Sequence, residues 1–462
     1  MRSWMLFALL LAAPGLRADD WPQWMGPNGD GVYREQGVLT ELPKAGLKDR
    51  WRKPIGMGYS GPAVAYGKVY VMDRKPDPKP GQRKKEAPKK DPKDPNKLIF
   101  PKDPVVERTI CLRADNGEQV WERANEVDYQ ISYGEGPRAT PTVADRKVYA
   151  LGAMGLLECL DAEKGTLLWR RDFQKEYAAP HQAWGWAAHP LLDGDRLVTL
   201  VGGKGSAVVA FDRNTGKELW RNLDSEEVGY APVLLAALGG KSQYIVYMSD
   251  GVYGLEPATG KKLWGLTYPV EGKPSRPSVP ITRPMMIEEN KLYLTSGYEG
   301  ELLIDLGPSG TAPEVVYHGT NIQKPGGDAK GLHGLMTTPI LAAGLVVGVD
   351  FNGELRGLDP KTGERKWESL AFWGNKPALF GTAFLTPHED RCFAFTDQGD
   401  LWLGQFTAKG YEQTSKVHLI DAVQPARGRR KVVWTHPAYA DKAVFVRNQR
   451  EIVCASIAAD KS

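Results

Sequence analysis

Residues 160–169, LDAEKGTLLW, have the form of a tight turn followed by a strand that ends in tryptophan. Four other stretches keep glycine at the sixth position and tryptophan at the tenth. They are LRADNGEQVW, FDRNTGKELW, LEPATGKKLW and LDPKTGERKW, which end at Trp121, Trp220, Trp264 and Trp367. Five copies of one spacing indicate that the chain is built from repeated structural units.

A second recurring element precedes these copies and consists of a short strand, a turn and a strand rich in Val, Leu and Tyr. Clear examples begin at residues 61, 140, 189, 283 and 338, and weaker ones at 231, 382 and 436. The two elements together give eight modules with a period of about 42 to 55 residues, each with four strands. Four-stranded units at this period predict an all-β fold, an eight-bladed β-propeller.

The two ends of the chain complement each other. The last module stops after three strands, whereas LKDRWRKP near the start supplies an isolated strand with Trp51 at the motif's tryptophan position. We therefore predict that the N-terminal strand completes the last blade and so removes an open sheet edge.

The repeated motif has a structural explanation. Asp161, Asp212 and Asp359 can accept backbone N–H groups in the turn, the glycine supplies a positive φ, and the following strand brings tryptophan to the outer edge. Large indoles at this edge would join neighbouring blades by burying apolar area. We assign this role to Trp51, Trp121, Trp169, Trp220, Trp264 and Trp367.

The chain divides into three parts. Residues 1–18 have a basic residue, an apolar run and a cleavage position typical of a signal peptide, which predicts a periplasmic or secreted protein. Residues 19–46 form an N-terminal arm, and residues 47–462 form the propeller, with a Lys/Pro-rich insertion at 75–107 in the first blade. No stretch reaches the ~18 apolar residues of a transmembrane helix.

Charge is concentrated in the insertion. Residues 75–103 carry ten Lys/Arg and five Asp/Glu, a local +5, and subtracting this from the total of +4 leaves −1 for the remaining chain. The body therefore lacks the basic surface typical of nucleic-acid-binding proteins.

Cys111, Cys159 and Cys454 occupy equivalent positions in different modules, too far apart for disulfides, so we expect small buried side chains there.

The module pattern TPxxxxxxxVYxxxxxGxLxxLDxxTGxxxW resembles the PQQ-type propeller repeat, which quinoprotein alcohol dehydrogenases share with the BamB-type outer-membrane assembly propeller. The resemblance covers residues 47–458, and the segment DWPQWMGPNGDG, with Trp21 and Trp24, resembles exported PQQ-like propellers of uncharacterised role. It implies the fold, but the same repeat serves enzymes and non-enzymes.

Candidate binding residues gather in the loops that cross from one blade to the next. Aromatic rings beside cationic groups around a funnel would suit an anionic or planar ligand. Alternatively, the same groups form hydrogen bonds within the long loops and with water in the channel. The candidates are His181, Trp184, Trp186, His189, Arg276, Arg283, His333, Trp373 and His436.

The resemblance also implies an alternative, because quinoprotein dehydrogenases hold a quinone between a tryptophan and a ring of two adjacent cysteines, with Ca²⁺ and a carboxylate base. This chain has no adjacent cysteine pair, and no matching set of residues can be aligned. Asp350, Asn352 and Glu354 are similar to a calcium loop, but their alignment with other blades favours a hairpin turn. We therefore assign neither catalytic residues nor a metal site.

The sequence favours a monomeric, exported, non-catalytic scaffold for binding or assembly in the cell envelope, with no cofactor. Its expected partners are envelope or outer-membrane proteins, or an anionic or glycan ligand, and not nucleic acid. One alternative is a PQQ-dependent oxidoreductase with Ca²⁺ and an atypical quinone site. Another is a polysaccharide-binding propeller.

Overall fold

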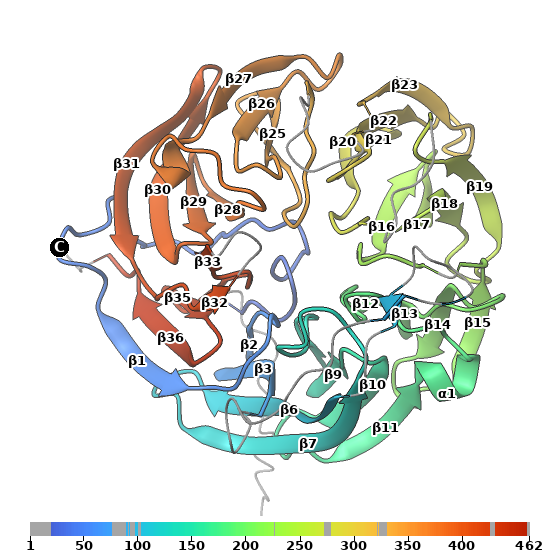
Figure 1. The fold of residues 1–462 in the computed structure, drawn as a ribbon, viewed down its shortest axis with the longest axis horizontal. Helices are drawn as coiled ribbons and strands as arrows, with labels where there is room; N and C mark the ends of the chain where they lie inside the picture. Colours follow the sequence, from blue (N-terminus) through green and yellow to red (C-terminus); the bar gives the residue numbers. More distant parts are fainter. Residues whose placement is uncertain are drawn as a thin grey trace, which may run out of the picture.

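The computed structural model describes residues 20–75, 89–90, 92, 98–99, 103–225, 227–271, 279–320, 322, 330–425 and 430–459. Eight four-stranded antiparallel sheets stand around a common axis (Figure 1). The predicted all-β, eight-bladed propeller is therefore confirmed.

In each blade the first strand of the module lies next to the axis and the tryptophan strand lies at the rim. The first four blades, each given from axis to rim, are β2 (Ala63–Ala65), β3 (Lys68–Arg74), β6 (Asp103–Arg113) and β7 (Gln119–Tyr129); β8 (Thr142–Ala144), β9 (Lys147–Leu151), β10 (Leu156–Asp161) and β11 (Leu167–Asp172); β12 (Leu191–Asp193), β13 (Arg196–Leu200), β14 (Val208–Asp212) and β15 (Glu218–Asn222); and β16 (Leu234–Leu238), β17 (Lys241–Met248), β18 (Gly251–Leu255) and β19 (Lys262–Thr267).

The remaining blades follow the same order. They are β20 (Met285–Glu288), β21 (Lys291–Ser296), β22 (Gly300–Asp305) and β23 (Glu314–His318); β24 (Ile340–Ala342), β25 (Leu345–Val349), β26 (Leu355–Leu358) and β27 (Arg365–Ser369); β28 (Ala383–His388), β29 (Arg391–Thr396), β30 (Asp400–Thr407) and β31 (Gly410–His418); and β34 (Ala438–Ala440), β35 (Ala443–Arg447), β36 (Glu451–Ser456) and β1 (Asp49–Pro54).

The elements outside the blades are short. Two small hairpins pair β4 (Lys89–Lys90) with β5 (Leu98–Ile99) and β32 (Gln424–Pro425) with β33 (Lys431–Val432). The helix α1 (Phe173–Tyr177) is capped by the Asp172 carboxylate, and the 3-10 helix η1 (Ala371–Trp373) precedes blade seven. None of the helices in the described ranges is long and apolar enough to cross a membrane.

The N-terminal strand closes the ring as predicted. β1 pairs antiparallel with β36, and Trp51 lies opposite Cys454 (Figure 1). Residues from both ends of the chain thus form the eighth blade. Since unpaired strand edges favour association with other chains, this pairing both closes the ring and removes an exposed edge.

The motif tryptophan packs on the motif glycine of the next blade. The Trp121 indole donates to the Ala162 carbonyl at 3.1 Å, and a Cβ added at Gly165 would lie 2.5 Å from the Trp121 ring. Gly165 also has φ +69°. Glycine is therefore required both by the backbone conformation and by the neighbouring indole. The same contact joins Trp51 to Gly117, Trp169 to Gly216 and Trp220 to Gly260.

The contact changes in the later blades. Trp264 donates to the Gln243 side chain at 2.8 Å, and Gln243 donates in turn to the Gly310 carbonyl of the next blade at 2.9 Å. Tyr317 replaces the tryptophan of blade five and donates to the Pro360 carbonyl at 3.2 Å. Trp264 and Tyr317 thus keep a polar link, whereas the buried indole nitrogen of Trp367 in blade six has no hydrogen-bond partner among the described residues.

The residue opposite each motif tryptophan must be small. Cys111 faces Trp121 and Cys159 faces Trp169, whereas a Cβ added at Gly254 would lie 2.0 Å from the Trp264 indole nitrogen. All four cysteines, including Cys392, are free and buried, and burial raises the pKa of each thiol to about 12. The expectation of small buried side chains without disulfides is met.

Two predicted segments lie largely outside the described residues. The predicted signal peptide, residues 1–18, is one of them. Within the insertion predicted at 75–107, the structure describes the hairpin of β4 and β5, and residues 103–107 belong to the blade strand β6. The blade sheet therefore begins earlier than the sequence-based boundary.

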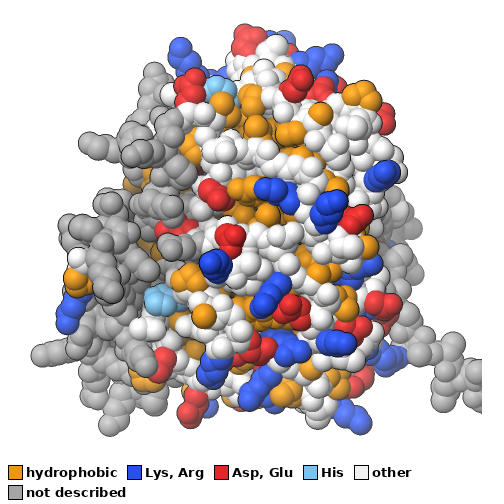
Figure 2. Space-filling model, turned by 90° about the vertical axis from the view of Figure 1, so that its right-hand side faces the viewer, with side chains coloured by type: hydrophobic (Ala, Val, Ile, Leu, Met, Phe, Trp, Pro, Cys, Tyr) orange, Lys and Arg blue, Asp and Glu red, His pale blue; other side chains and the backbone are white. Residues whose placement is uncertain are grey.

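Both signs of charge are interspersed on the rim. Figure 2, viewed from the side of the ring, shows Lys and Arg side chains alternating with Asp and Glu. Ion pairs also connect neighbouring blades, such as Lys68 with Glu163 at 2.6 Å, and Arg213 with Asp145. Because the carboxylates of both pairs are exposed to solvent, such pairs add little stability, and the cores between blades contribute more.

The contact between indole and glycine can be tested with Gly165→Ala. Alanine at this position meets both the positive φ and the Trp121 ring, so we expect a loss of about 1–3 kcal/mol beyond the cost of φ alone. Gly194→Ala is the matched control, because Gly194 has φ +56° with no atom within 4 Å of an added Cβ. Chemical denaturation measures both variants. Equal losses would contradict the role of the indole.

Candidate functional site

The N-terminal arm enters the central channel of the propeller. Trp21 exchanges two backbone hydrogen bonds of 2.8 Å with Val64 of β2, and Tyr33 donates its N–H to the Pro387 carbonyl of β28 at 2.9 Å. The arm then leaves the axis, and Val38 pairs with Ala458. Residues 21–33 therefore form an inserted loop, drawn in blue near the centre of Figure 1.

Trp24 of this loop brings three of the candidate residues together. Its ring stacks on His189 at 4.7 Å between centroids and 9° between planes, and it meets His436 edge-on at 5.5 Å. The Arg283 guanidinium lies 5.7 Å from the Trp24 ring centroid. These three candidates precede the inner strands of different blades, so the loop joins groups that are far apart in the sequence.

Burial governs the charges at this cluster. Burial lowers the pKa of His189 to about 3, and its Nδ1 accepts the Thr140 N–H at 2.9 Å. Burial, together with the nearby His189, holds the pKa of His436 well below its usual range. Burial also lowers the pKa of Arg283 to about 10. At neutral pH the cluster therefore has two uncharged imidazoles and one cation.

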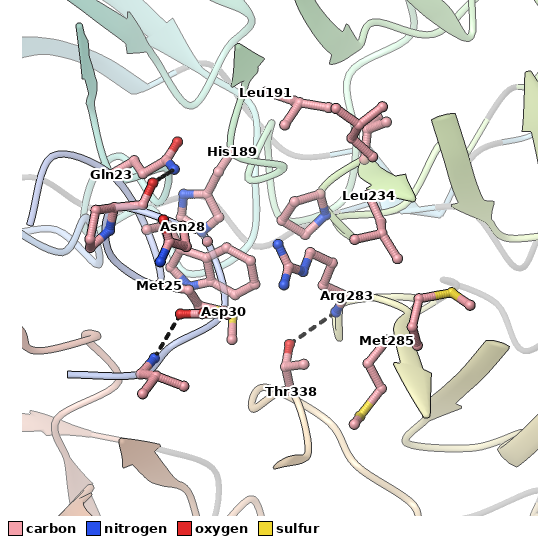
Figure 3. Close-up of a pocket in the computed structure, with 18 of the residues that line it drawn as sticks. Gln23, Met25, Asn28, Asp30, His189, Leu191, Leu234, Arg283, Met285 and Thr338 are labelled. Carbon is pink, nitrogen blue, oxygen red and sulfur yellow. Dashed lines mark hydrogen bonds between the residues drawn. The ribbon is translucent and has the colours of Figure 1, made fainter. Parts of the chain in front are cut away.

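A cavity of 660 Å³ lies beside the loop (Figure 3). The arm forms one wall, including Gln23, Asn28 and Asp30, and the inner strands of blades three to six form the other. Arg283 reaches into the space between these walls in Figure 3. The volume is within the range of ~300–1,000 Å³ found for small-molecule sites.

The other crossing-loop candidates lie apart from the axial cluster. His181 and Trp184 are partly buried, and Trp184 packs edge-on against Tyr230 at 5.6 Å. Trp186 is almost fully buried and donates to the Val201 carbonyl at 2.8 Å, which makes it part of the core between blades two and three. Arg276 lies outside the described residues.

His333 and Trp373 belong to buried clusters near the hairpins of blades six and seven. The Trp373 indole donates to Asp397 at 3.0 Å. Burial lowers the pKa of His333 to about 4 and raises that of Asp350 to about 7. Asp350 accepts the backbone N–H groups of His333 and Asn352 and an Arg356 hydrogen bond of 2.8 Å. The segment interpreted as a hairpin turn does form one between β25 and β26.

Trp24 was absent from the sequence-based list of binding candidates. The sequence contains a weak signal for it, the pair Trp21 and Trp24 in a segment without the propeller period. Large aromatic residues in an arm rich in Gly and Pro indicate burial somewhere, but they do not indicate where.

The cluster does not fit a quinone with calcium. The described residues contain no group of three or more His, Cys, Asp or Glu side chains arranged to hold a metal ion. Asp30, the carboxylate lining the cavity, is bound to Arg34 at 2.6 Å. The flat face of His189 is covered by Trp24, so a planar group would have to displace the arm.

Comparison with known proteins identifies the family. The model for the family described as outer membrane protein assembly factor BamB matches residues 107–369, which is 263 of the 462 residues. The chain belongs to this family. It is a family of PQQ-like propellers, in agreement with the resemblance of the repeats.

Individual relatives are distant. Outer membrane protein assembly factor BamB of Burkholderia pseudomallei is 29% identical over 156 residues, covering 31% of this chain and 37% of the relative. BamB of Shewanella oneidensis is 22% identical over 256 residues, covering 52% and 60%. A quinohemoprotein alcohol dehydrogenase of Pseudomonas putida is 26% identical over 216 residues, covering 45% and 29%. The matches thus span less than two thirds of each relative.

Solved structures share the fold. BamB from Moraxella catarrhalis superposes with a TM-score of 0.51 at 14% identity, covering 80% of this chain and 99% of that chain. A europium-containing methanol dehydrogenase gives a TM-score of 0.58 at 12% identity, covering 93% and 89%. Because an assembly factor and an enzyme match similarly well, the fold does not separate the two functions.

The burial of His189 predicts a pH dependence of stability. The folded pKa lies below the unfolded value, so between about pH 6.5 and 3 the unfolded chain binds a proton that the folded chain does not. The neutral imidazole therefore makes its complete contribution to the free energy of unfolding above this window. As the pH falls through the window, each such histidine lowers the free energy of unfolding by about 1.4 kcal/mol per pH unit.

His189→Asn should lower this slope by about one proton, because asparagine can still accept the Thr140 N–H and does not titrate. The control is His418→Asn, since His418 is half-exposed and bound to Asp400, which raises its pKa. Urea denaturation from pH 4 to 6 measures the slopes. An unchanged slope in His189→Asn would contradict the burial of a neutral imidazole.

Proposed function

We propose that this chain is an exported, non-catalytic propeller that acts as a binding or assembly scaffold in the cell envelope, in the periplasm or outside the cell. The observation that carries the proposal is the arm inserted in the channel, which fills one side of the axis. Trp24 of the chain's own arm covers His189, so the channel is organised around a protein side chain rather than around a planar cofactor. The family match supports envelope or outer-membrane proteins as partners.

The face of the crossing loops is the surface we assign to a protein partner. Trp184, Tyr133 and Trp434 are partly buried in the crossing loops of three different blades, and Tyr133 and Trp434 lie 6.0 Å apart between ring centroids. Partly exposed Trp and Tyr side chains are enriched among the residues that dominate protein interfaces. A polysaccharide would use the same rings, so glycan retention is the outcome that favours the polysaccharide-binding alternative.

The experiment measures binding of the purified protein to the outer-membrane assembly proteins of its source organism by surface plasmon resonance. Trp184→Ala should weaken saturable binding roughly tenfold or more, as expected for a tryptophan at the centre of an interface. Leu168→Ala is the control, because Leu168 is exposed on the rim strand β11, away from the crossing loops. Thermal melts verify that both variants fold.

Two results would overturn the proposal. One is the absence of saturable binding to any envelope assembly protein. The other is saturable quenching of tryptophan fluorescence by PQQ with Ca²⁺, together with quinone-dependent oxidation of an alcohol or sugar. The second result would establish the oxidoreductase alternative, with the arm displaced from the axis.

A further inference from the structure

The walls of the axial cavity are aliphatic in four consecutive blades. The lining residues at the inner strands of blades three to six are Leu191, Leu192, Leu234, Leu235, Met285, Met286, Ile340 and Leu341. Leu341 is 45% exposed, so solvent reaches this wall. Ile340 is buried and the other six side chains are partly buried. A continuous wall of partly exposed aliphatic side chains is unusual unless something binds it.

The inner strands that meet the arm have a different composition. Their corresponding positions hold the small residues Ala63, Thr142 and Ala438, each almost fully buried. Small side chains leave room for the arm, although Thr142 also lines the cavity, whereas the larger side chains of blades three to six line most of its other wall. The inner strands that meet the arm thus have small side chains that accommodate it, and the aliphatic inner strands of blades three to six line the cavity.

Arg283 supplies a partly buried charge at this aliphatic wall. In the described part of the chain it has no ion pair within 4 Å, and its buried Nε has no hydrogen-bond partner. Trp24 lies against one side of the guanidinium, and Gly29 approaches so closely that an added Cβ would lie 3.1 Å from Nη1. Asp30 faces the same cavity and its charge favours the charged form of Arg283, but its ion pair within 4 Å is with Arg34, at 2.6 Å.

A fully buried arginine of this chain shows how a guanidinium is satisfied by backbone acceptors. Arg447 donates to the carbonyl oxygens of Met72, Gly56 and Asn448 at 2.6–3.0 Å. Arg283 has no comparable set of acceptors among the described residues. Because a partly buried cation with an unpartnered Nε is costly, an acceptor from outside the chain would reduce that cost.

We infer that the axial cavity binds an aliphatic carboxylate, a molecule with one acidic head and an unbranched hydrocarbon chain. Arg283 holds the carboxylate through charge-assisted hydrogen bonds, and the leucine and methionine walls of blades three to six cover the chain. The flexible side chains of Met285 and Met286 suit an alkyl chain of variable shape. The hydroxyl of Thr338, which accepts the backbone N–H of Arg283 at 3.0 Å, retains its own hydrogen for the ligand.

This inference goes beyond the scaffold function and does not depend on it. A propeller that binds no envelope protein could still bind the carboxylate, and the two experiments use different residues. The probe is dodecanoate, titrated by calorimetry into the purified protein below the micellar concentration. We expect saturation at one molecule per chain.

Arg283→Gln should weaken dodecanoate binding roughly 10- to 100-fold, the effect of losing hydrogen bonds to a charged group. Arg170→Gln, on the exposed side of β11, is the matched control and should bind as the wild type does. Dodecanol, which lacks the charge, should bind the wild type and Arg283→Gln equally. Equal dodecanoate binding by both arginine variants would overturn the inference, as would binding of a leucine-rich peptide carboxylate in place of dodecanoate.

A second variant and a local probe keep the test decisive if Arg283→Gln does not fold. Leu341→Glu changes a half-exposed side chain and places a negative charge on the cavity wall, so it should weaken dodecanoate binding at least tenfold in a folded protein. In methyl NMR, dodecanoate should shift the signals of Met285 and Met286 and leave that of Met72, buried in blade one, unchanged. Unshifted Met285 and Met286 signals would contradict the assigned site.

Discussion

The axial channel is the constraint on which the rest of this molecule depends. Eight blades closed into a ring hold their inner strands apart, and the space between them must be filled by side chains, by another segment or by a ligand. Here the arm fills one side, with Trp21 paired to Val64 and Trp24 stacked on His189. The other side remains a cavity of 660 Å³.

This division explains the unusual electrostatics at the axis. The same loop that packs on His189 and His436 also covers one side of Arg283, so the imidazoles stay neutral and the guanidinium keeps its charge. Among the described residues, none forms an ion pair with Arg283 within 4 Å, and its buried Nε has no hydrogen-bond partner. Groups that are costly to bury persist where they specify a structure or bind a partner. The neutral histidines contact the arm, whereas the arginine reaches into the cavity.

The repeated spacing was sufficient to predict the blades, the closure by β1 and the positions of the rim tryptophans, because each of these features occurs many times. The spacing predicted the positive φ of Gly165 but not its contact with Trp121, because that contact crosses from one blade to the next. Spacing alone does not fix the direction in which a loop side chain points. For that reason Trp186 and Trp373, chosen as funnel residues, lie in buried clusters with Val201 and Asp397.

The insertion of the arm was not predictable from the sequence. Trp24 and His189 are 165 positions apart, and Trp24 occurs in a segment outside the repeats, so the period does not relate the two residues. The most direct test of the account is hydrogen–deuterium exchange of the arm. We predict that the amides of Trp21, Tyr33 and Leu39, which donate to Val64, Pro387 and Ile457, exchange as slowly as those of β2. Exchange at the rate of an unstructured peptide would contradict an arm inserted along the axis.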